Sequence, residues 1–335
     1  MRARPFAVVT AVLATLSSCL VPYDKTGEGY ACASDADCRA PLICLRAKSV
    51  CGKAPAAPDA GIRLAVAEYT SAYPYFWTLG APTHEVPSLG RYDFSDTAVV
   101  RRHLDSLRYA GFDVAAFQWY GPGTSSDSAF LTMLEASKDA GVGWVAFYKS
   151  EWASGPKSAA DISAVLARVA TRFATAPGVD YLHLDGGPAL FVDVAFNADA
   201  CEVIGRWNNV AQDAGSKVSL VMRAAGDVAT NPGKCAAQPW SWYTNSNSLS
   251  SVRVSQVTTV MPGFWANDDA SPKLVRNPNR FAADLAAWVD GGTTMLFVNS
   301  FNGWLDGTAV ETSETWKSDS GHGLYLDALH STLSR

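Results

Sequence analysis

The sequence has no excess of positive charge, since 27 Lys and Arg residues against 32 Asp and Glu residues give a net charge of −5. A nucleic-acid-binding face needs clustered basic side chains, so this balance argues against a nucleic-acid partner. The five histidines, His84, His103, His183, His322 and His330, are scattered with no pair at ligand spacing, so we predict no metal site and no cofactor. The Gly-x-Ser-x-Gly turn of serine hydrolases is also missing, which excludes that arrangement.

Long apolar runs are lacking as well. The apolar stretch 6–16 follows a basic start and is too short to span a membrane as a stable helix, so residues 1–18 are predicted to be an export signal. Its end, Leu16-Ser17-Ser18-Cys19, resembles the bacterial lipobox, and the resemblance implies cleavage before Cys19 and acylation of that cysteine. We therefore expect a lipid anchor in the cell envelope, at the outer membrane or cell surface. An ordinary signal peptide with an incidental cysteine is the alternative.

The remaining cysteines form an even set, which in an exported chain predicts disulfides. They are Cys32, Cys38, Cys44, Cys51, Cys201 and Cys235, and their pairing stays open. The first four lie in a module, residues 19–52, that is too small to hold a core without cross-links. Zinc is the competing interpretation, and the absence of a Cys-x-x-Cys pair or a nearby histidine disfavours it.

Residues 53–61, rich in Pro, Ala and Gly, indicate a linker. From 62 to 335, short apolar runs alternate with amphipathic stretches, which is the pattern of repeated βα units. Strands are expected at 63–69, 112–120, 143–148, 189–194, 217–222, 240–245, 257–262 and 293–300, and helices at 96–110, 128–140, 159–174, 199–214 and 280–290. We predict an α/β fold, a (β/α)8 TIM barrel preceded by the small disulfide-rich module.

In such a barrel the functional side chains gather at the C-terminal ends of the strands. Those ends are rich in polar and aromatic residues here, and planar rings suit the apolar faces of sugars. For any single ring, core packing is the alternative. The expected substrate-binding residues are Gln118, Trp119, Tyr120, Trp152, Asp193, Arg223, Tyr243, Asn245, Trp265, Asn302 and Trp304.

The last strand runs into Ser300-Phe-Asn-Gly-Trp-Leu-Asp-Gly-Thr-Ala-Val-Glu311. This segment resembles the signature Ser-Phe-Asn-Glu-Trp-x-Glu-Gly-Thr-x-Ile-Glu of glycoside hydrolase family 99, the endo-α-mannosidases, and of family 99-like bacterial domains. Weaker similarities, such as Asp185-Gly-Gly-Pro188 and Met261-Pro-Gly-Phe264, extend the resemblance over residues 62–330. It implies a TIM barrel acting on an α-linked glycan.

Glycoside hydrolysis uses one carboxyl group to protonate the leaving oxygen and a second at the anomeric side. The resemblance matches the two family glutamates to Gly303, which has no carboxyl group, and Asp306, whose side chain is one methylene shorter. It implies that Asp306 acts as acid and then base. A loop aspartate that forms a turn before Gly307 is the alternative. We expect Glu68, on the strand beside the last one, to be its partner, with Glu151 as the other candidate. Structural ion pairs with Arg223, Lys149 or Arg276 are the alternative for both glutamates.

Three functions follow from these residues. The first is an exported lipoprotein whose barrel, expected to be monomeric, hydrolyses an α-linked polysaccharide or glycan. The second is a carbohydrate-binding pseudoenzyme, which the glycine at position 303 favours. The third is a structural or adhesive envelope protein in which the cysteine-rich module does the work.

Overall fold

The computed structural model describes residues 42–45, 50–53, 63–78, 80, 83–194, 199–224, 251–254, 257–266 and 268–334. The chain divides into two compact units, Met1–Ala57 and Pro58–Arg335. In the first unit, strands β1 (Leu42–Leu45) and β2 (Val50–Lys53) form an antiparallel pair. The predictions for Cys19, Cys32, Cys38 and the linker fall largely outside the described residues. No helix in the described ranges is long and apolar enough to cross a membrane.

The second unit is built around a curled, mostly parallel sheet. Neighbouring strands in it follow the order β8, β7, β5, β4, β3, β11, β10. Their bounds are β3 (Leu64–Tyr69), β4 (Val114–Trp119), β5 (Gly143–Tyr148), β7 (Gly187–Asp193), β8 (Ser219–Arg223), β10 (Val257–Val260) and β11 (Met295–Val298). The last strand pairs with the first, as in a (β/α)8 barrel. The predicted strand 240–245, which would close the barrel between β8 and β10, lies outside the described residues.

Two short antiparallel strands border this parallel set. Strand β6 (His183–Leu184) pairs with the start of β7. Strand β9 (Ser251–Val254) pairs with β10 and lies in a connection for which no element was predicted. The sheet is therefore mixed at its margins.

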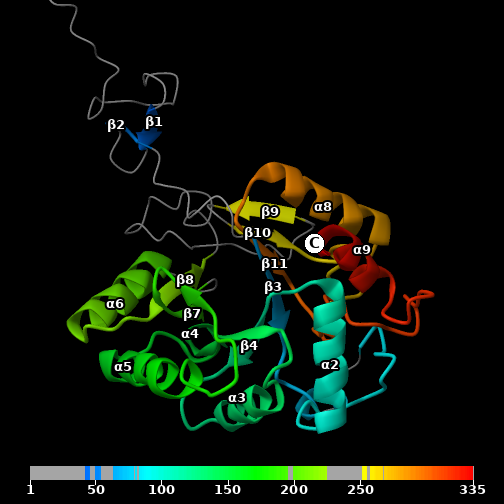
Figure 1. Cartoon of the computed structure of the whole chain (residues 1–335), viewed down its shortest axis with the longest axis horizontal. Helices are drawn as coiled ribbons and strands as arrows, with labels where there is room; N and C mark the ends of the chain where they lie inside the picture. The colour runs from blue at the N-terminus through cyan, green and yellow to red at the C-terminus, as the bar shows by residue number, and fades with distance from the viewer. Residues whose placement is uncertain are drawn as a thin grey trace, which may run out of the picture. The chain divides into compact units, whose positions relative to one another are not determined.

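Helices follow most of the parallel strands and lie along the outside of the sheet in Figure 1. They are α1 (Tyr75–Thr78), α2 (Thr97–Ala110), α3 (Ser125–Ala136), α4 (Ser150–Ser154), α5 (Ala159–Arg168) with the π-helical turn η2 (Val169–Phe173), α6 (Ala200–Asp213), α8 (Pro278–Gly291) and α9 (Leu324–Leu333). The helices α1, α4 and α9 were not predicted. Of these, α9 packs against α2 and α8.

Local chemistry explains where these elements begin and end. The side chain of Asp96 caps α2 by accepting a hydrogen bond from Ala98 N, and Gly111 ends the helix in the left-handed conformation with φ of 84°. A Cβ at position 111 would lie 2.7 Å from the Leu333 Cβ, so glycine also lets α9 approach. All six residues of β5 are buried, as expected for a parallel strand covered on both faces.

Candidate active site

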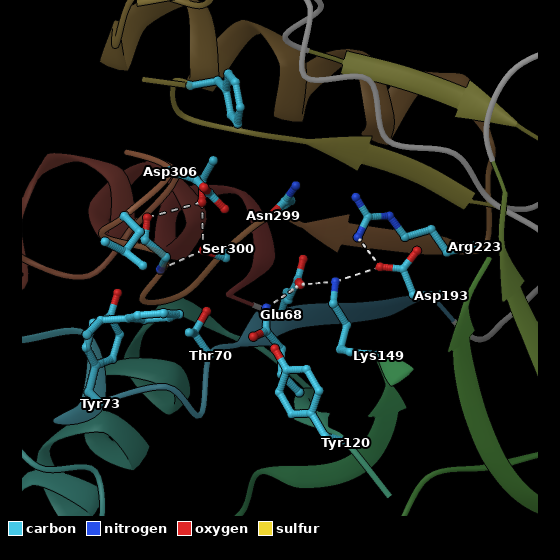
Figure 2. Close-up of a pocket in the computed structure, with 16 residues that line it drawn as sticks. Glu68, Thr70, Tyr73, Tyr120, Lys149, Asp193, Arg223, Asn299, Ser300 and Asp306 are labelled. Carbon is cyan, nitrogen blue, oxygen red and sulfur yellow. Dashed lines mark hydrogen bonds and ion pairs between the residues drawn. The ribbon is translucent and has the colours of Figure 1, made fainter. Parts of the chain in front are cut away.

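A cavity of about 400 Å³ opens at the C-terminal ends of the parallel strands. Figure 2 shows side chains at or directly after the ends of β3, β4, β5, β7 and β8 meeting the loop after β11. The lining residues are Glu68, Thr70, Tyr73, Phe76, Gln118, Tyr120, Lys149, Asp193, Arg223, Phe264, Asn299, Ser300, Gly303, Leu305, Asp306 and Thr308. Six of the predicted site residues are thus brought together, namely Glu68, Gln118, Tyr120, Asp193, Arg223 and Asp306.

A chain of buried charges crosses this cavity, drawn with dashed lines in Figure 2. Lys149 Nζ donates to Asp193 Oδ2 at 2.7 Å and lies 3.5 Å from Glu68 Oε1. Arg223 Nη1 donates to the same Asp193 oxygen at 3.0 Å. Gln118 Nε2 donates to Glu68 Oε1 at 2.8 Å, so the glutamate is held by two donors. Because Lys149 and Arg223 both form ion pairs with Asp193, their positive charge is partly neutralised within the protein.

Two atoms of this charged chain have no hydrogen-bond partner among the described residues. They are Glu68 Oε2, an acceptor, and Arg223 Nε, a donor, on side chains of residues that are 3% and 8% exposed. A buried polar atom without a partner costs about 1–3 kcal/mol. A ligand with both hydroxyl donors and acceptors, such as a sugar, would offer partners to both atoms.

Asp306 lies on the loop after β11 and projects into the cavity (Figure 2). The residue is exposed by surface area, yet the enclosing protein walls desolvate its carboxylate. Desolvation and, next, the negative charge of Glu68 raise the pKa of Asp306, while Lys149 and Arg223 oppose this shift. No described residue donates a hydrogen bond to this carboxylate. Its environment therefore favours a carboxylic acid that carries a proton at higher pH than an ordinary aspartate.

Gly303 lies where the resemblance places the first family glutamate. A Cβ there would lie 2.3 Å from Ser300 Oγ and 2.4 Å from Thr308 Oγ1. These two hydroxyls are 2.9 Å apart, and Ser300 Oγ also accepts a hydrogen bond from Gly303 N at 2.7 Å. The space for a side chain at 303 is thus occupied by a hydroxyl pair, and no carboxylate stands there.

Tyr73 is a cavity residue that the sequence did not suggest. Its hydroxyl oxygen accepts a hydrogen bond from Trp304 N at 2.9 Å, which leaves the phenolic proton available as a donor. Burial raises the pKa of Tyr73, so that proton is retained at neutral pH. Tyr73 lies between β3 and α1, four residues after the strand ends. A search limited to the residues directly at the strand ends therefore misses it.

Lys149 was expected as an ion-pair partner and not as a site residue, although it directly follows β5 and lines the cavity. Its ammonium group also lies 4.5 Å from the ring centroid of Phe147. The signal that would have identified it was its position directly after a buried strand.

Glu151 is not brought to the cavity. It belongs to α4, its side chain is fully buried, and its Oε1 accepts a hydrogen bond from Trp207 Nε1 at 2.7 Å. Both carboxylate oxygens also lie 3.3 Å from Lys157 N. The expectation of a catalytic Glu151 is corrected accordingly: it links α4 to α6 and has no access to a substrate in this cavity.

The structure places three predicted sugar contacts in the core instead. Trp119 is 0% exposed and donates from Nε1 to Asp127 Oδ1. Trp304 is also 0% exposed, within an aromatic cluster. The buried amide of Asn302 accepts from Thr70 N at 2.7 Å and donates to Thr70 O at 3.1 Å. None of these three residues lines the cavity.

Trp265 is half-buried and does not line the cavity, and one face of its ring is covered. His84 stacks on it with the ring centroids 3.7 Å apart and the planes 9° from parallel. Trp265 N donates to Asp306 O at 2.8 Å, so this residue supports the loop through its backbone. Of the other predicted contacts, Tyr243 and Asn245 lie outside the described residues, as does the side chain of Trp152.

Two further predictions concern metal and cysteine. In the described ranges, no group of three or more His, Cys, Asp or Glu side chains could hold a metal ion. Cys201, on α6, is disulfide-bonded. Cys235 lies outside the described residues, and the partner of Cys201 stays open.

No protein-family model matches the chain, and no curated protein matches it significantly. Solved structures do. Two structures of the GH99 endo-α-mannosidase from Bacteroides thetaiotaomicron, one in complex with bis-tris propane, superpose with TM-scores of 0.56 and 0.58 at 14% and 13% identity. Each alignment covers 81% of this chain and 96% or 95% of the other. A glycoside hydrolase-like protein superposes with a TM-score of 0.57 at 15% identity, over 84% of this chain and 97% of the other. The chain therefore has a GH99-like fold.

Proposed function

We propose that the protein is a glycosidase that hydrolyses an α-linked glycan, with Asp306 as general acid and base. The supporting observation is the placement of Asp306, which faces the cavity, has no donor among the described residues and has a raised pKa. A general acid must carry its proton before the leaving oxygen departs, and a raised pKa provides that state. The α-linkage rests on the resemblance to endo-α-mannosidases.

Glu68 is the proposed second carboxylate. Gly303 supplies no carboxyl group, whereas Glu68 lines the same cavity as Asp306, and its negative charge is the second cause, after desolvation, of the raised pKa of Asp306. Glu68 Oε1 is held by Gln118 and Lys149, while Oε2 has no partner among the described residues. A fixed carboxylate with one free oxygen suits a group that activates or stabilises at the anomeric side.

The test is product release from a panel of α-mannans and bacterial and fungal wall glycans. The mature chain is compared with Asp306→Asn and Glu68→Gln, and with Asp290→Asn as an exposed control on α8. We expect each site variant to lower kcat/KM by about 10²- to 10⁴-fold, the usual contribution of acid–base catalysis, and the control to leave it unchanged. Unchanged hydrolysis in both site variants would refute these roles.

A carbohydrate-binding pseudoenzyme is the second candidate. The hydroxyl pair of Ser300 and Thr308 at the place of a missing catalytic side chain favours it. Calorimetry distinguishes the two functions, because a pseudoenzyme binds a glycan that it never cleaves. A chain that binds no glycan would contradict both.

We further propose that the mature protein is a lipoprotein anchored to the cell envelope through Cys19, and that it acts there as a monomer. The lipobox-like end of the signal supports the anchor. Labelling of cells with a radioactive fatty acid, compared between the native chain and Cys19→Ala, tests it. Loss of label in the variant is expected, and an unlabelled native chain would contradict the anchor.

A further inference from the structure

A second cavity lies on another side of the loop that carries Asp306. It has a volume of about 330 Å³, and its lining includes His103, Glu311, Arg102 and His322. None of its lining residues lines the cavity of Asp306. Two of them, His103 and Glu311, are 2% and 5% exposed, so ionisable groups are buried at the inner end of this cavity.

The Glu311 carboxylate is the centre of a buried hydrogen-bond network. Its Oε2 accepts from Tyr92 Oη at 2.7 Å and from Trp304 Nε1 at 3.0 Å. Its Oε1 lies 3.1 Å from His103 Nε2, and the other nitrogen of that ring lies 2.7 Å from Tyr69 Oη. A carboxylate only accepts, so His103 donates from Nε2 in this arrangement.

Through its backbone Glu311 also closes the loop. Glu311 N donates to Phe301 O at 2.8 Å, and Val310 N donates to Ser300 O at 2.9 Å. The loop thus leaves at Phe301 and returns at Glu311, with Trp304 and Asp306 between them. The carboxylate of Glu311 reaches back across this loop to the indole of Trp304.

Trp304 connects the network to the first cavity. Its side chain is held by Glu311, and its backbone N–H donates to the hydroxyl of Tyr73, which lines the cavity of Asp306. Asp306 follows Trp304 by two residues on the same loop. A change in the position of Trp304 therefore moves Asp306. It also moves the backbone N–H that donates to the hydroxyl of Tyr73.

We propose that Glu311 is a positioning residue, which holds the loop 300–308 through the Trp304 indole and so fixes Asp306 in the catalytic cavity. The anchoring of the loop is independent of the proposed function, and only the expected effect on kcat rests on it. Misplacement of a catalytic group by about 1 Å can lower a rate by about 10²-fold, so a rigid anchor at the base of the loop affects kcat more than KM.

Hydrogen exchange of the full chain, followed by mass spectrometry, tests the anchor without any substrate. We expect Glu311→Ala to accelerate exchange in peptides covering residues 300–308, and Trp304→Phe, which deletes the indole N–H but keeps an aromatic ring, to do the same. Asp127→Ala is the matched control, because Asp127 is also buried and accepts from an indole, that of Trp119. Its effect is expected outside the loop. Unchanged exchange in 300–308, or an equal rise over the whole barrel, would overturn the proposal.

Chemical rescue gives a second measurement. Because Glu311 lines the second cavity, formate can reach the space that Glu311→Ala creates and accept from Trp304 and Tyr92 again. We expect formate to slow exchange in residues 300–308 of Glu311→Ala, but not in the double variant with Trp304→Phe. Where a cleaved glycan is known, kcat of Glu311→Ala falls about 10- to 100-fold with a smaller change in KM. Normal kcat with accelerated exchange would overturn the positioning role, whereas no cleavage by the unmodified chain would count against the proposed function alone.

Discussion

Asp306 is kept in an environment that opposes its negative charge. The surrounding protein desolvates the carboxylate, and the negative charge of Glu68 repels it. Lys149 and Arg223 attract it less than free cations would, because both are ion-paired with Asp193. Such a residue stabilises the folded state poorly, because its charged form is less favourable in the cavity than in water. Groups that carry chemistry commonly have this property.

Stability should therefore depend on pH through Asp306. Its pKa is raised in the folded state, so at a pH above this raised value the ionised carboxylate destabilises the fold, and below the ordinary aspartate value it has no effect. Relative to Asp306→Asn, the free energy of unfolding of the unmodified chain is expected to fall as pH rises through that window. Urea unfolding of both proteins from acid to neutral pH measures the difference. Equal stability at every pH would contradict the shift.

The sequence predicted site residues from their position at strand ends, and this position alone does not show which side chains face the cavity. Gln118 and Trp119 show the limit, since adjacent residues of a strand point to opposite sides. Gln118 lines the cavity, whereas Trp119 faces Phe173 in the helix layer. The sequence places both at a strand end but does not say which of the two faces inward. Tyr73 was missed for another reason, because it reaches the cavity from a loop.

Among the elements, the loop after β11 depends on one small residue, Gly303. Gly303→Ala would place a Cβ within 2.3–2.4 Å of two hydroxyl oxygens, so Ser300 and Thr308 must both rotate and lose their mutual hydrogen bond. We expect a loss of about 1–3 kcal/mol in the free energy of unfolding, as for other overpacked sites. Chemical denaturation measures it.

Gly205→Ala is the matched control for that substitution. Gly205 lies inside α6, and a Cβ there has no neighbour within 4 Å. Because alanine favours a helix over glycine by about 1 kcal/mol, this control is expected to be neutral or stabilising. A Gly303→Ala variant as stable as the control would mean that the hydroxyl pair adapts without cost. A glutamate could then be restored at 303 as well.

The β1–β2 hairpin predicts a disulfide pairing that the sequence left open. Its register sets the Cα of Cys44 directly opposite that of Cys51. Directly opposed Cα atoms lie about 4.5–5.5 Å apart, within the range that a disulfide needs. We therefore predict a Cys44–Cys51 disulfide, which leaves Cys32 to pair with Cys38.

Tryptic digestion without reduction checks this pairing, since Arg46 and Lys48 separate Cys44 from Cys51. Peptide 40–46 is expected to be linked to 49–53, and peptide 26–39 to be two hydrogens lighter than its reduced form. Peptide 26–39 linked to either of the other two would refute the prediction. Reduction before digestion is the control that releases the linked peptides.

The strands with strong apolar runs were predictable from the sequence, and so was the order of these strands along the chain. The predicted strands at 143–148 and 257–262 correspond to β5 and β10 within two residues at each end. The short helix α4 was missed because the residues after β5 have no helical periodicity long enough to detect. Strand β9 was missed because it is defined by its pairing with β10, which follows it in the chain. Its own residues do not indicate that pairing.

At the scale of the whole molecule, the second unit holds a large hydrophobic core. The buried residues that the structure describes in the main cluster lie between Ala65 and Leu329, within the second unit. The cavity residues lie within the same unit. Stability and any glycan cleavage should therefore be properties of Pro58–Arg335 alone.

We predict that a chain beginning at Pro58 melts within about 2 °C of the mature chain, which corresponds to about 1 kcal/mol for a domain of this size. Differential scanning calorimetry of both proteins measures it, and the glycan panel applied to both checks that activity or binding is retained. Residues 19–57 alone serve as the control and are expected to bind none of the glycans. Glycan binding by that module, with none by the barrel, would instead favour the adhesive envelope protein, because the recognition surface would then lie outside the GH99-like fold.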